Sequence, residues 1–305
     1  MESLNKVGLK YLKNCSNDEV VGIYLRYYRY SKSSVGTRKH SLKYFFDKLY
    51  FGYDKTVSDI SKYDLLEYFD YLNNKDDISL ITKENKWKII RGFLRFCMEY
   101  FDDFFVVVPK YIIKWKSIHK ESGSNKEVVL TKMEVERILY WLKKNDYQYY
   151  IIFRLFAETG MRKGELIKII CKNVDLEKRS IKTLGKSGRV VYYMSIEMRD
   201  ILAEYIGKRE RTVLFSFHGM KRYSSRAFNL YLKRVLGRIG IEKNVTCKTF
   251  RSTINTLRKL MGCPLEERKL LLNHKMMDVN TNYYVKLTYV EYLRIYDKWN
   301  PFGNG

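Results

Sequence analysis

The chain has 305 residues, of which 58 are Lys or Arg and 34 are Asp or Glu, so its formal net charge is +24. Its length suits about two domains, and this excess of positive charge indicates a polyanionic partner, with nucleic acid as the leading candidate. The sequence contains no run of about 18 apolar residues, no signal peptide and no lipidation motif, which argues against a membrane partner and predicts a cytoplasmic protein.

The cysteines and histidines give no support to a metal site. Five cysteines are scattered without a C-x-x-C pair and are interpreted as reduced packing residues. The four histidines, at positions 40, 119, 218 and 274, lack the spacing of zinc ligands. A G-x-x-x-x-G-K-[ST] phosphate loop is also missing. The sequence therefore predicts no metal, no cofactor and no nucleotide hydrolysis.

The first part of the chain is expected to be helical. Hydrophobic periodicity and capping residues predict helices over 17–30, with Ser16 as the cap, over 35–49, from the residue after Ser61 onward, and over 82–100. Residues 1–116 are therefore predicted to form an all-α domain with Lys and Arg on its outward faces. Helices with basic faces can lie against the grooves and backbone of DNA.

A polar segment separates this part from the rest. Residues 117–126 read SIHKESGSNK and interrupt strongly periodic sequence on both sides. Residues 117–127 are therefore predicted to be an exposed linker between a first domain, 1–116, and a second domain, 128–305.

The second part is predicted to be mixed but mainly helical. A helix over 131–144 starts with a capping box, because Glu134 follows Thr131 by three residues. Alternating apolar residues on either side of GKSGR predict a β-hairpin from strands 180–184 and 190–194. The other expected elements are a helix over 148–158, a turn and helix over TGMRKGEL to about 170, a helix over 196–208, an apolar run over 212–217, and further helices to about 296. The tail, 288–305, could pack in cis or dock on a neighbouring subunit, and the second arrangement is expected.

A run of basic residues in the second part ends at two adjacent tyrosines. Five cationic or potentially cationic side chains could surround one anionic group, and a phenol follows that could attack it. A phosphodiester gains negative charge in its transition state, so fixed donors aimed at its oxygens lower the barrier. Taken singly, each residue has an ordinary alternative as a surface charge, a turn lysine or a structural histidine. The run consists of Arg162, Lys186, Lys248, Arg251 and His274, followed by Tyr283 and Tyr284.

Four segments resemble the motifs of the tyrosine recombinase and phage integrase family, in the family's order and with its usual separations. They are TGMRKGEL, the hairpin GKSGRVVYYM, KTFRSTINTLRKLMG, which resembles the H-x-x-R helix, and LLNHKMMDVNTNYYVKL. The helical first part resembles the core-binding domain of that family, and the likeness covers about residues 20–290. It implies a mainly α fold with a small β-sheet, in which an all-α core-binding domain and a mixed α+β catalytic domain form a two-domain clamp around DNA.

The resemblance assigns a role to each basic residue. Arg162 and Arg251 would hold the phosphate, since guanidinium is always charged and binds two oxygens at once. Lys186 would donate a proton to the departing 5′ hydroxyl, with Arg189 as a possible substitute. His274 would orient the phosphate or accept the proton of the nucleophile.

Two positions depart from the usual family pattern. Lys248 stands where histidine is commonest, so charge is kept but imidazole chemistry is not, and Lys248 could share the proton-donor task with Lys186. Asn273 stands in LLNH where glycine is usual, and asparagine tolerates left-handed backbone better than most residues.

The nucleophile is expected to be Tyr284, with Tyr283 as the alternative. The two tyrosines follow His274 by ten and nine residues, and both distances occur in the family. The register of DVNTNYYVKL favours the second tyrosine, and the adjacent ring would then be a packing residue on the opposite side of the chain.

The implied function is site-specific DNA recombination. Tyr284 would form a 3′-phosphotyrosyl link and release a 5′ hydroxyl, without metal or ATP, and strand exchange would proceed in a homotetramer on two DNA sites. Two alternatives stay open at this point. One is relaxation of DNA by chemistry of the type IB topoisomerases, and the other is a catalytically decayed DNA-binding protein of the same fold.

Overall fold

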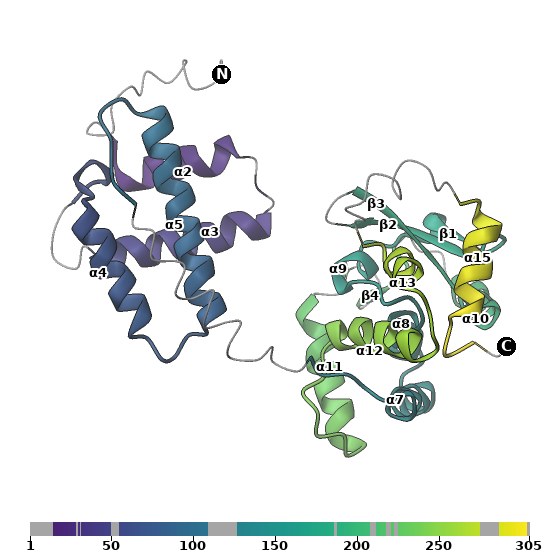
Figure 1. Ribbon diagram of the computed structural model, residues 1–305. Helices are drawn as coiled ribbons and strands as arrows, with labels where there is room; N and C mark the ends of the chain where they lie inside the picture. The colour runs from purple at the N-terminus through teal and green to yellow at the C-terminus, as the bar shows by residue number, and fades with distance from the viewer. Residues whose placement is uncertain are drawn as a thin grey trace. The chain divides into compact units, whose positions relative to one another are not determined.

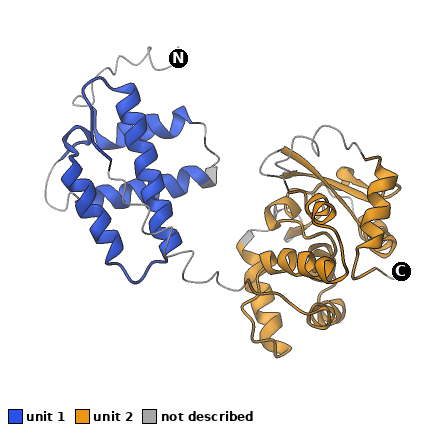
Figure 2. Ribbon diagram, in the orientation of Figure 1, with its two compact units in different colours: residues 1–125 blue, residues 126–305 orange. Residues whose placement is uncertain are grey.

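The computed structural model describes residues 15–28, 30, 32–49, 55–108, 127–185, 188–207, 212–217, 221–222, 225–274 and 287–303. The chain divides into two compact units, Met1–Asn125 and Lys126–Gly305, which are called unit 1 and unit 2 and are coloured separately in Figure 2. The division falls inside the expected linker, 117–127, of which only Glu127 is among the described residues. Within the described ranges no helix is long and apolar enough to cross a membrane.

Unit 1 is built from helices packed around an aromatic core. Its elements, labelled in Figure 1 except for the short 3₁₀ helix, are α2 (Asn17–Tyr27), α3 (Lys32–Leu49), η2 (Val57–Asp59), α4 (Lys62–Asn73) and α5 (Leu80–Tyr100). The expected cap at Ser16 is confirmed, because its hydroxyl accepts a hydrogen bond from a backbone N–H in the first turn of α2. The helix predicted to begin after Ser61 is capped in the same way by the Ser61 hydroxyl. Trp87 and Phe93 of α5 are fully buried in the core.

Over its described residues, unit 2 is mainly helical with two small antiparallel sheets, one of three strands and one of two strands. Its elements are α7 (Lys132–Asn145), α8 (Tyr147–Thr159), α9 (Lys163–Leu166), η3 (Cys171–Asn173), β1 (Val174–Asp175), β2 (Ser180–Gly185), β3 (Gly188–Tyr193), α10 (Ile196–Gly207), β4 (Ser216–Phe217), β5 (Lys221–Arg222), α11 (Ser225–Arg238), α12 (Cys247–Leu260), α13 (Leu265–Leu271) and α15 (Tyr289–Lys298). Strands β1–β3 form the first sheet, and β4 and β5 form the second. The predicted hairpin is confirmed as β2 and β3, which pair from Ser180 opposite Tyr193 to Gly185 opposite Gly188. The fully buried Phe153 and Phe156 place α8 at the centre of this core.

The helix that begins within TGMRKGEL is shorter than predicted. It ends at Leu166 rather than near Ile170, because the next backbone groups are bonded elsewhere. The N–H of Leu214 donates to the carbonyl of Ile169, and the N–H of Cys171 donates to the carbonyl of Thr212. A segment more than 40 residues later in the sequence therefore competes for the hydrogen bonds that would have continued the helix. The short strand β1 was also not predicted.

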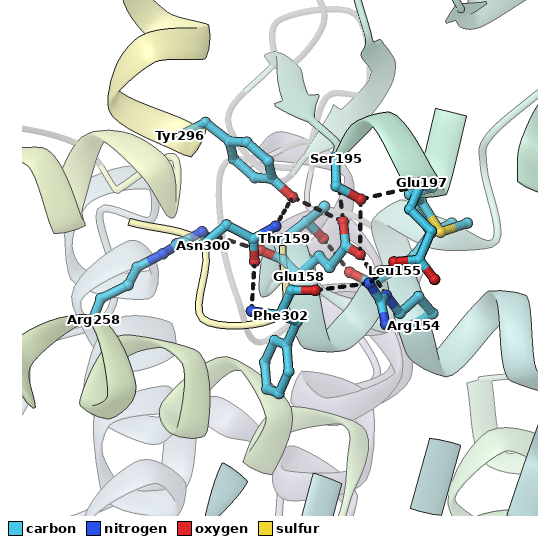
Figure 3. A network of polar contacts seen from close by, with 11 residues as sticks. Arg154, Leu155, Glu158, Thr159, Ser195, Glu197, Arg258, Tyr296, Asn300 and Phe302 are labelled. Atoms are coloured by element: carbon cyan, nitrogen blue, oxygen red, sulfur yellow. Dashed lines mark hydrogen bonds and ion pairs between the residues drawn. The ribbon is translucent and has the colours of Figure 1, made fainter. Parts of the chain in front are cut away.

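The tail packs in cis, so the expectation that it docks on a neighbouring subunit is wrong for the described residues 287–303. Tyr296 of α15 is buried and donates to Oε2 of the buried Glu158 at 2.9 Å. The buried Arg258 of α12 donates to the carbonyl oxygens of Glu158 at 3.0 Å and Trp299 at 3.2 Å. Figure 3 shows Tyr296 and Ser195 converging on the Glu158 carboxylate. Apolar periodicity predicts that α15 has a buried face, but it does not reveal which chain buries that face.

Candidate active site

Arg162, Arg251 and His274, which we call the cationic cluster, come from three separate segments of unit 2. Arg162 immediately precedes α9, Arg251 lies in the second turn of α12, and His274 follows α13. Burial and the Arg162 guanidinium lower the pKa of Arg251. Burial, followed by the charges of Arg251 and Arg162, lowers the pKa of His274. Groups that disfavour each other's positive charge in this way form a natural site for an anion.

Arg251 is the structural centre of the cluster. Its Nη1 donates to the carbonyl oxygen of Gly160 at 2.7 Å, and its Nη2 donates to the carbonyl oxygen of Leu272 at 2.5 Å. Gly160 ends α8 with a φ of 64°, and a Cβ atom there would lie 2.7 Å from Leu272 Cδ2 and 2.8 Å from Ile254 Cγ2. Only glycine adopts this left-handed backbone readily and also leaves room for the two neighbouring side chains. The ends of α8 and α13 are therefore tied to α12 through one guanidinium.

Arg162 is oriented by a buried carboxylate. Oε1 of Glu165 accepts a hydrogen bond from Nη1 of Arg162 at 3.0 Å, and Oε2 accepts one from the Arg162 backbone N–H at 2.9 Å. The Glu165 side chain is 3% exposed, whereas that of Arg162 is 48% exposed. The guanidinium therefore keeps a solvent-facing side on which an anion can bind, while its inner side is fixed by Glu165.

Glu165 and Tyr192 were not predicted from the sequence, yet they interact with the two arginines. The Tyr192 hydroxyl donates to Oε2 of Glu165 at 2.6 Å, and the guanidinium of Arg251 lies close enough to interact electrostatically with the phenol. Burial and the Glu165 carboxylate raise the pKa of Tyr192, so the phenol stays protonated. Glu165 could have been found from its place three residues after Arg162, which is a capping-box spacing. Tyr192 carried no such signal, because it is one of 27 tyrosines.

Lys248 lies one turn before Arg251 on α12 but has a different partner. Its Nζ is 3.1 Å from Oε1 of Glu127, and its side chain is 81% exposed. Hydrogen bonds from Ser252 and Lys248 lower the pKa of Glu127. The structure thus brings three of the predicted residues together and pairs Lys248 with Glu127. The other predicted residues, Lys186, Tyr283 and Tyr284, lie outside the described residues.

The turn that carries His274 agrees with the expectation for Asn273. Asn273 has a φ of 51°, in the left-handed region that asparagine tolerates. Its Nδ2 donates to the carbonyl oxygen of Val191 in β3 at 2.9 Å, and the backbone N–H of His274 donates to the carbonyl oxygen of Lys269 at 2.9 Å. The turn after α13 is therefore fixed both to its own helix and to the hairpin. Among the described residues, no three metal-ligating side chains lie together.

The second unit matches the model of the phage integrase family over residues 128–291, which is more than half of the chain. Tyrosine recombinase XerA of Saccharolobus solfataricus is 25% identical over 201 residues, 60% of this chain and 66% of XerA. Tyrosine recombinase XerC of Leptospira interrogans is 22% identical over 314 residues, 98% of this chain and 94% of XerC.

Solved structures with the same fold include two that contain DNA. The Tn1549 transposon integrase in complex with transposon right end DNA has a TM-score of 0.69 and 15% identity, and the match covers 92% of this chain and 98% of the integrase. The XerH site-specific recombinase bound to its difH substrate has a TM-score of 0.66 and 18% identity, with 92% and 82% covered.

Proposed function

The chain belongs to the phage integrase family, and we propose that its cationic cluster binds one DNA phosphate while Tyr284 attacks that phosphate. It is a tyrosine-type site-specific DNA recombinase, an enzyme that cuts and rejoins DNA by transesterification. The observation that carries the proposal for the site is the convergence of Arg162, Arg251 and His274. The three residues span more than 100 positions in the sequence, yet each lies close enough to alter the ionisation of another.

The two arginines are proposed to stabilise the transition state. Attack on a phosphodiester places a second negative charge on the phosphoryl oxygens, and donors that are already oriented stabilise this charge without reorganising. Glu165 fixes Arg162, and two backbone carbonyl groups fix Arg251, so both guanidiniums are held before DNA binds. Each can then direct its remaining N–H groups at the phosphate.

The proton transfers are assigned to the lysines and to His274. Lys186 supplies the proton that the departing 5′ hydroxyl needs, and Lys248 shares this task once DNA draws its ammonium group away from Glu127. His274 accepts the proton of the tyrosine or donates a hydrogen bond to the phosphate. Tyr284 forms a 3′-phosphotyrosyl link, which conserves the energy of the broken bond for rejoining. No metal ion or cofactor is assigned a role.

The first unit and the charge of the chain are proposed to serve DNA binding. The net charge of +24 favours duplex DNA as the partner, and two solved structures of the same fold contain transposon end DNA or a difH substrate. Unit 1 is proposed to be the core-binding domain and unit 2 the catalytic domain, which together clamp the duplex. Recombination is proposed to take place in a homotetramer on two DNA sites.

Covalent capture of DNA tests the proposed chemistry and selects the target sequence in the same experiment. The protein is incubated, in EDTA and without ATP, with a library of nicked duplexes whose flanking sequences are randomised. Attack at a phosphate close to the nick releases a short fragment, so the reverse step fails and the adduct accumulates. We expect protein–DNA complexes that survive detergent, and a common sequence among the captured duplexes. The double variant Tyr283→Phe/Tyr284→Phe is the control.

The absence of any detergent-stable complex would contradict the enzyme assignment and favour a DNA-binding protein that has lost its activity. The selected duplex then allows a second test, in which two such sites should exchange strands. Relaxation of supercoiled plasmids without the selected site, and without exchange, would instead favour the topoisomerase alternative.

The pH dependence of adduct formation tests His274 as the acceptor of the tyrosine's proton. Burial and the two arginines disfavour imidazolium, so the neutral base should persist to a pH below 6.5, the ordinary pKa of histidine. With subsaturating DNA, the rate should fall about tenfold per pH unit once the pH is below the lowered pKa of His274. With saturating DNA, the phosphate stabilises imidazolium, so the acid limb should move to higher pH. An acid limb of unchanged position in His274→Gln would contradict this role.

A further inference from the structure

We propose that Tyr192 is a positioning residue that connects the two arginines of the cationic cluster and fixes the direction in which Arg251 presents its free N–H groups. The inference rests on the proposed function, because it concerns how the phosphate-binding groups are held for transfer. Tyr192 does not touch the reacting atoms, and it acts through Glu165 and Arg251.

The contacts of Tyr192 form a continuous bridge. Its ring lies in the core and the residue is 2% exposed. Its hydroxyl donates to Oε2 of Glu165 at 2.6 Å, and Oε1 of the same carboxylate accepts from Nη1 of Arg162 at 3.0 Å. The phenol also interacts electrostatically with the nearby guanidinium of Arg251. The bridge therefore runs from Arg162 through Glu165 and Tyr192 to Arg251.

The hydrogen-bonding capacity of these groups makes the bridge directional. A phenol has one hydrogen, and here the Glu165 carboxylate accepts it, so the Tyr192 oxygen is left as an acceptor for a guanidinium N–H. Arg251 has five N–H donors. One is bonded to Gly160 and one to Leu272, and the Tyr192 oxygen lies close enough to interact with the guanidinium as well. These two bonds and the neighbouring Tyr192 oxygen determine where the remaining N–H groups of the planar guanidinium point.

Removing the hydroxyl would therefore have a specific effect. The buried carboxylate of Glu165 would lose a hydrogen-bond donor, which is costly for a buried group, and the guanidinium of Arg251 would lose a nearby oxygen. Arg251 would be free to turn toward Glu165, since opposite charges attract and the phenol no longer separates them. The positive charge would stay, but its alignment with the phosphate oxygens would be lost.

The next residue along strand β3 provides a matched control. Tyr193 lies on the opposite side of the strand, where its ring stacks on Tyr292 with a centroid distance of 4.5 Å. Partial burial raises the pKa of Tyr193, so it is also a protonated phenol. The substitution Tyr193→Phe removes the same atom from the same strand, one residue away, without touching Glu165 or Arg251.

The test compares Tyr192→Phe and Tyr193→Phe with the natural protein in single-turnover adduct formation on the selected nicked duplex. Each protein is assayed well below its own melting temperature, so that the measured rate belongs to the folded chain. We expect Tyr192→Phe to lower the rate at saturating protein about tenfold and to change the apparent Kd for DNA less than about twofold. Tyr193→Phe should change neither quantity by more than about twofold.

A double-mutant cycle with Glu165→Gln separates the bridge from a general packing effect. In the Glu165→Gln background the carboxylate end of the bridge is already lost, so Tyr192→Phe should lower the rate by a further factor of about three at most. A tenfold loss in both backgrounds would overturn the proposal, as would a rate for Tyr192→Phe within twofold of the natural protein. In those cases the natural protein still forms the adduct, so the proposed function stands. If the natural protein forms no adduct, the proposed function fails and the inference fails with it.

Discussion

Replacing Arg251 by lysine should slow covalent capture of DNA by about 10³-fold at saturating protein, although the positive charge is kept. Lysine has three donors on a flexible stem and cannot reproduce a planar fork that bonds Gly160, Leu272 and a phosphate together. A loss of this size corresponds to about 4 kcal/mol of transition-state stabilisation. Because the charge is unchanged, the apparent Kd for the selected duplex should change less than about threefold.

A second arginine with similar bonding serves as the control for this substitution. Arg268 of α13 donates to the carbonyl oxygen of Cys263 at 3.2 Å and to the amide oxygen of Asn255 at 3.4 Å. It is therefore also held by neutral oxygens, but Arg268 itself is not a member of the cationic cluster. Arg268→Lys should leave the rate within about threefold of the natural value. A loss of less than tenfold in Arg251→Lys would show that the cluster supplies charge alone.

The substitution Glu158→Gln should destabilise unit 2 by about 3–5 kcal/mol. The buried carboxylate of Glu158 accepts hydrogen bonds from Arg154 at 2.5 Å, from the Ser195 hydroxyl at 3.1 Å and from the Tyr296 hydroxyl at 2.9 Å. Glutamine replaces one acceptor oxygen with an NH₂ group, which would face these donors, and it leaves the buried Arg154 without its internal counter-charge. The free energy of unfolding would be measured by urea denaturation.

Glu197 provides the control, because its carboxylate bonds the same arginine from a more exposed place. Its Oε2 lies 2.9 Å from Nη2 of Arg154, and its side chain is 43% exposed. Partly exposed ion pairs contribute little, so Glu197→Gln should cost less than about 1 kcal/mol. Equal losses in the two variants would contradict the view that Glu158 holds the tail in place. The natural chain and both variants should also be compared for adduct formation, since Glu158 precedes the Thr159–Gly160 turn that anchors Arg251.

The sequence predicted those features that depend on local signals. Ser16, Ser61 and Thr131 marked the starts of helices because a cap requires only a side chain and the next turn of backbone. The hairpin was predictable from alternation around GKSGR. Asn273 could be expected to adopt a left-handed conformation because the residue type itself allows it.

Features that depend on distant segments could not be predicted. The helix that begins at Lys163 ends early because residues 212–214 bond to the backbone that follows it. Whether the tail packs on its own chain depends on its contacts with Glu158. Nothing in the local sequence of the tail indicates those contacts. The role of Tyr192 could not be predicted for the same reason, since it depends on the interactions of its hydroxyl with Glu165 and Arg251, which come from other segments of the chain.

The motif residues therefore suggested members for the proposed site but not how those residues are held. Arg162 and Arg251 were selected for their chemistry, and the structure adds the carboxylate, the phenol and the two carbonyl groups that orient them. For Lys248, by contrast, the structure shows a partner that differs from the predicted one. Its spacing from Arg251 predicted a shared face toward one phosphate, whereas in the structure its ammonium pairs with Glu127.

The most direct test of the account is to identify the residue and the DNA end that are joined in the trapped adduct. The complex formed on the selected nicked duplex would be digested with protease and nuclease, and the modified peptide would be sequenced by mass spectrometry. We predict a 3′-phosphotyrosyl link at Tyr284, a free 5′ hydroxyl on the released strand, and loss of the adduct in Tyr284→Phe but not in Tyr283→Phe. A link through a 5′ phosphate, or through a residue other than these two tyrosines, would contradict the account.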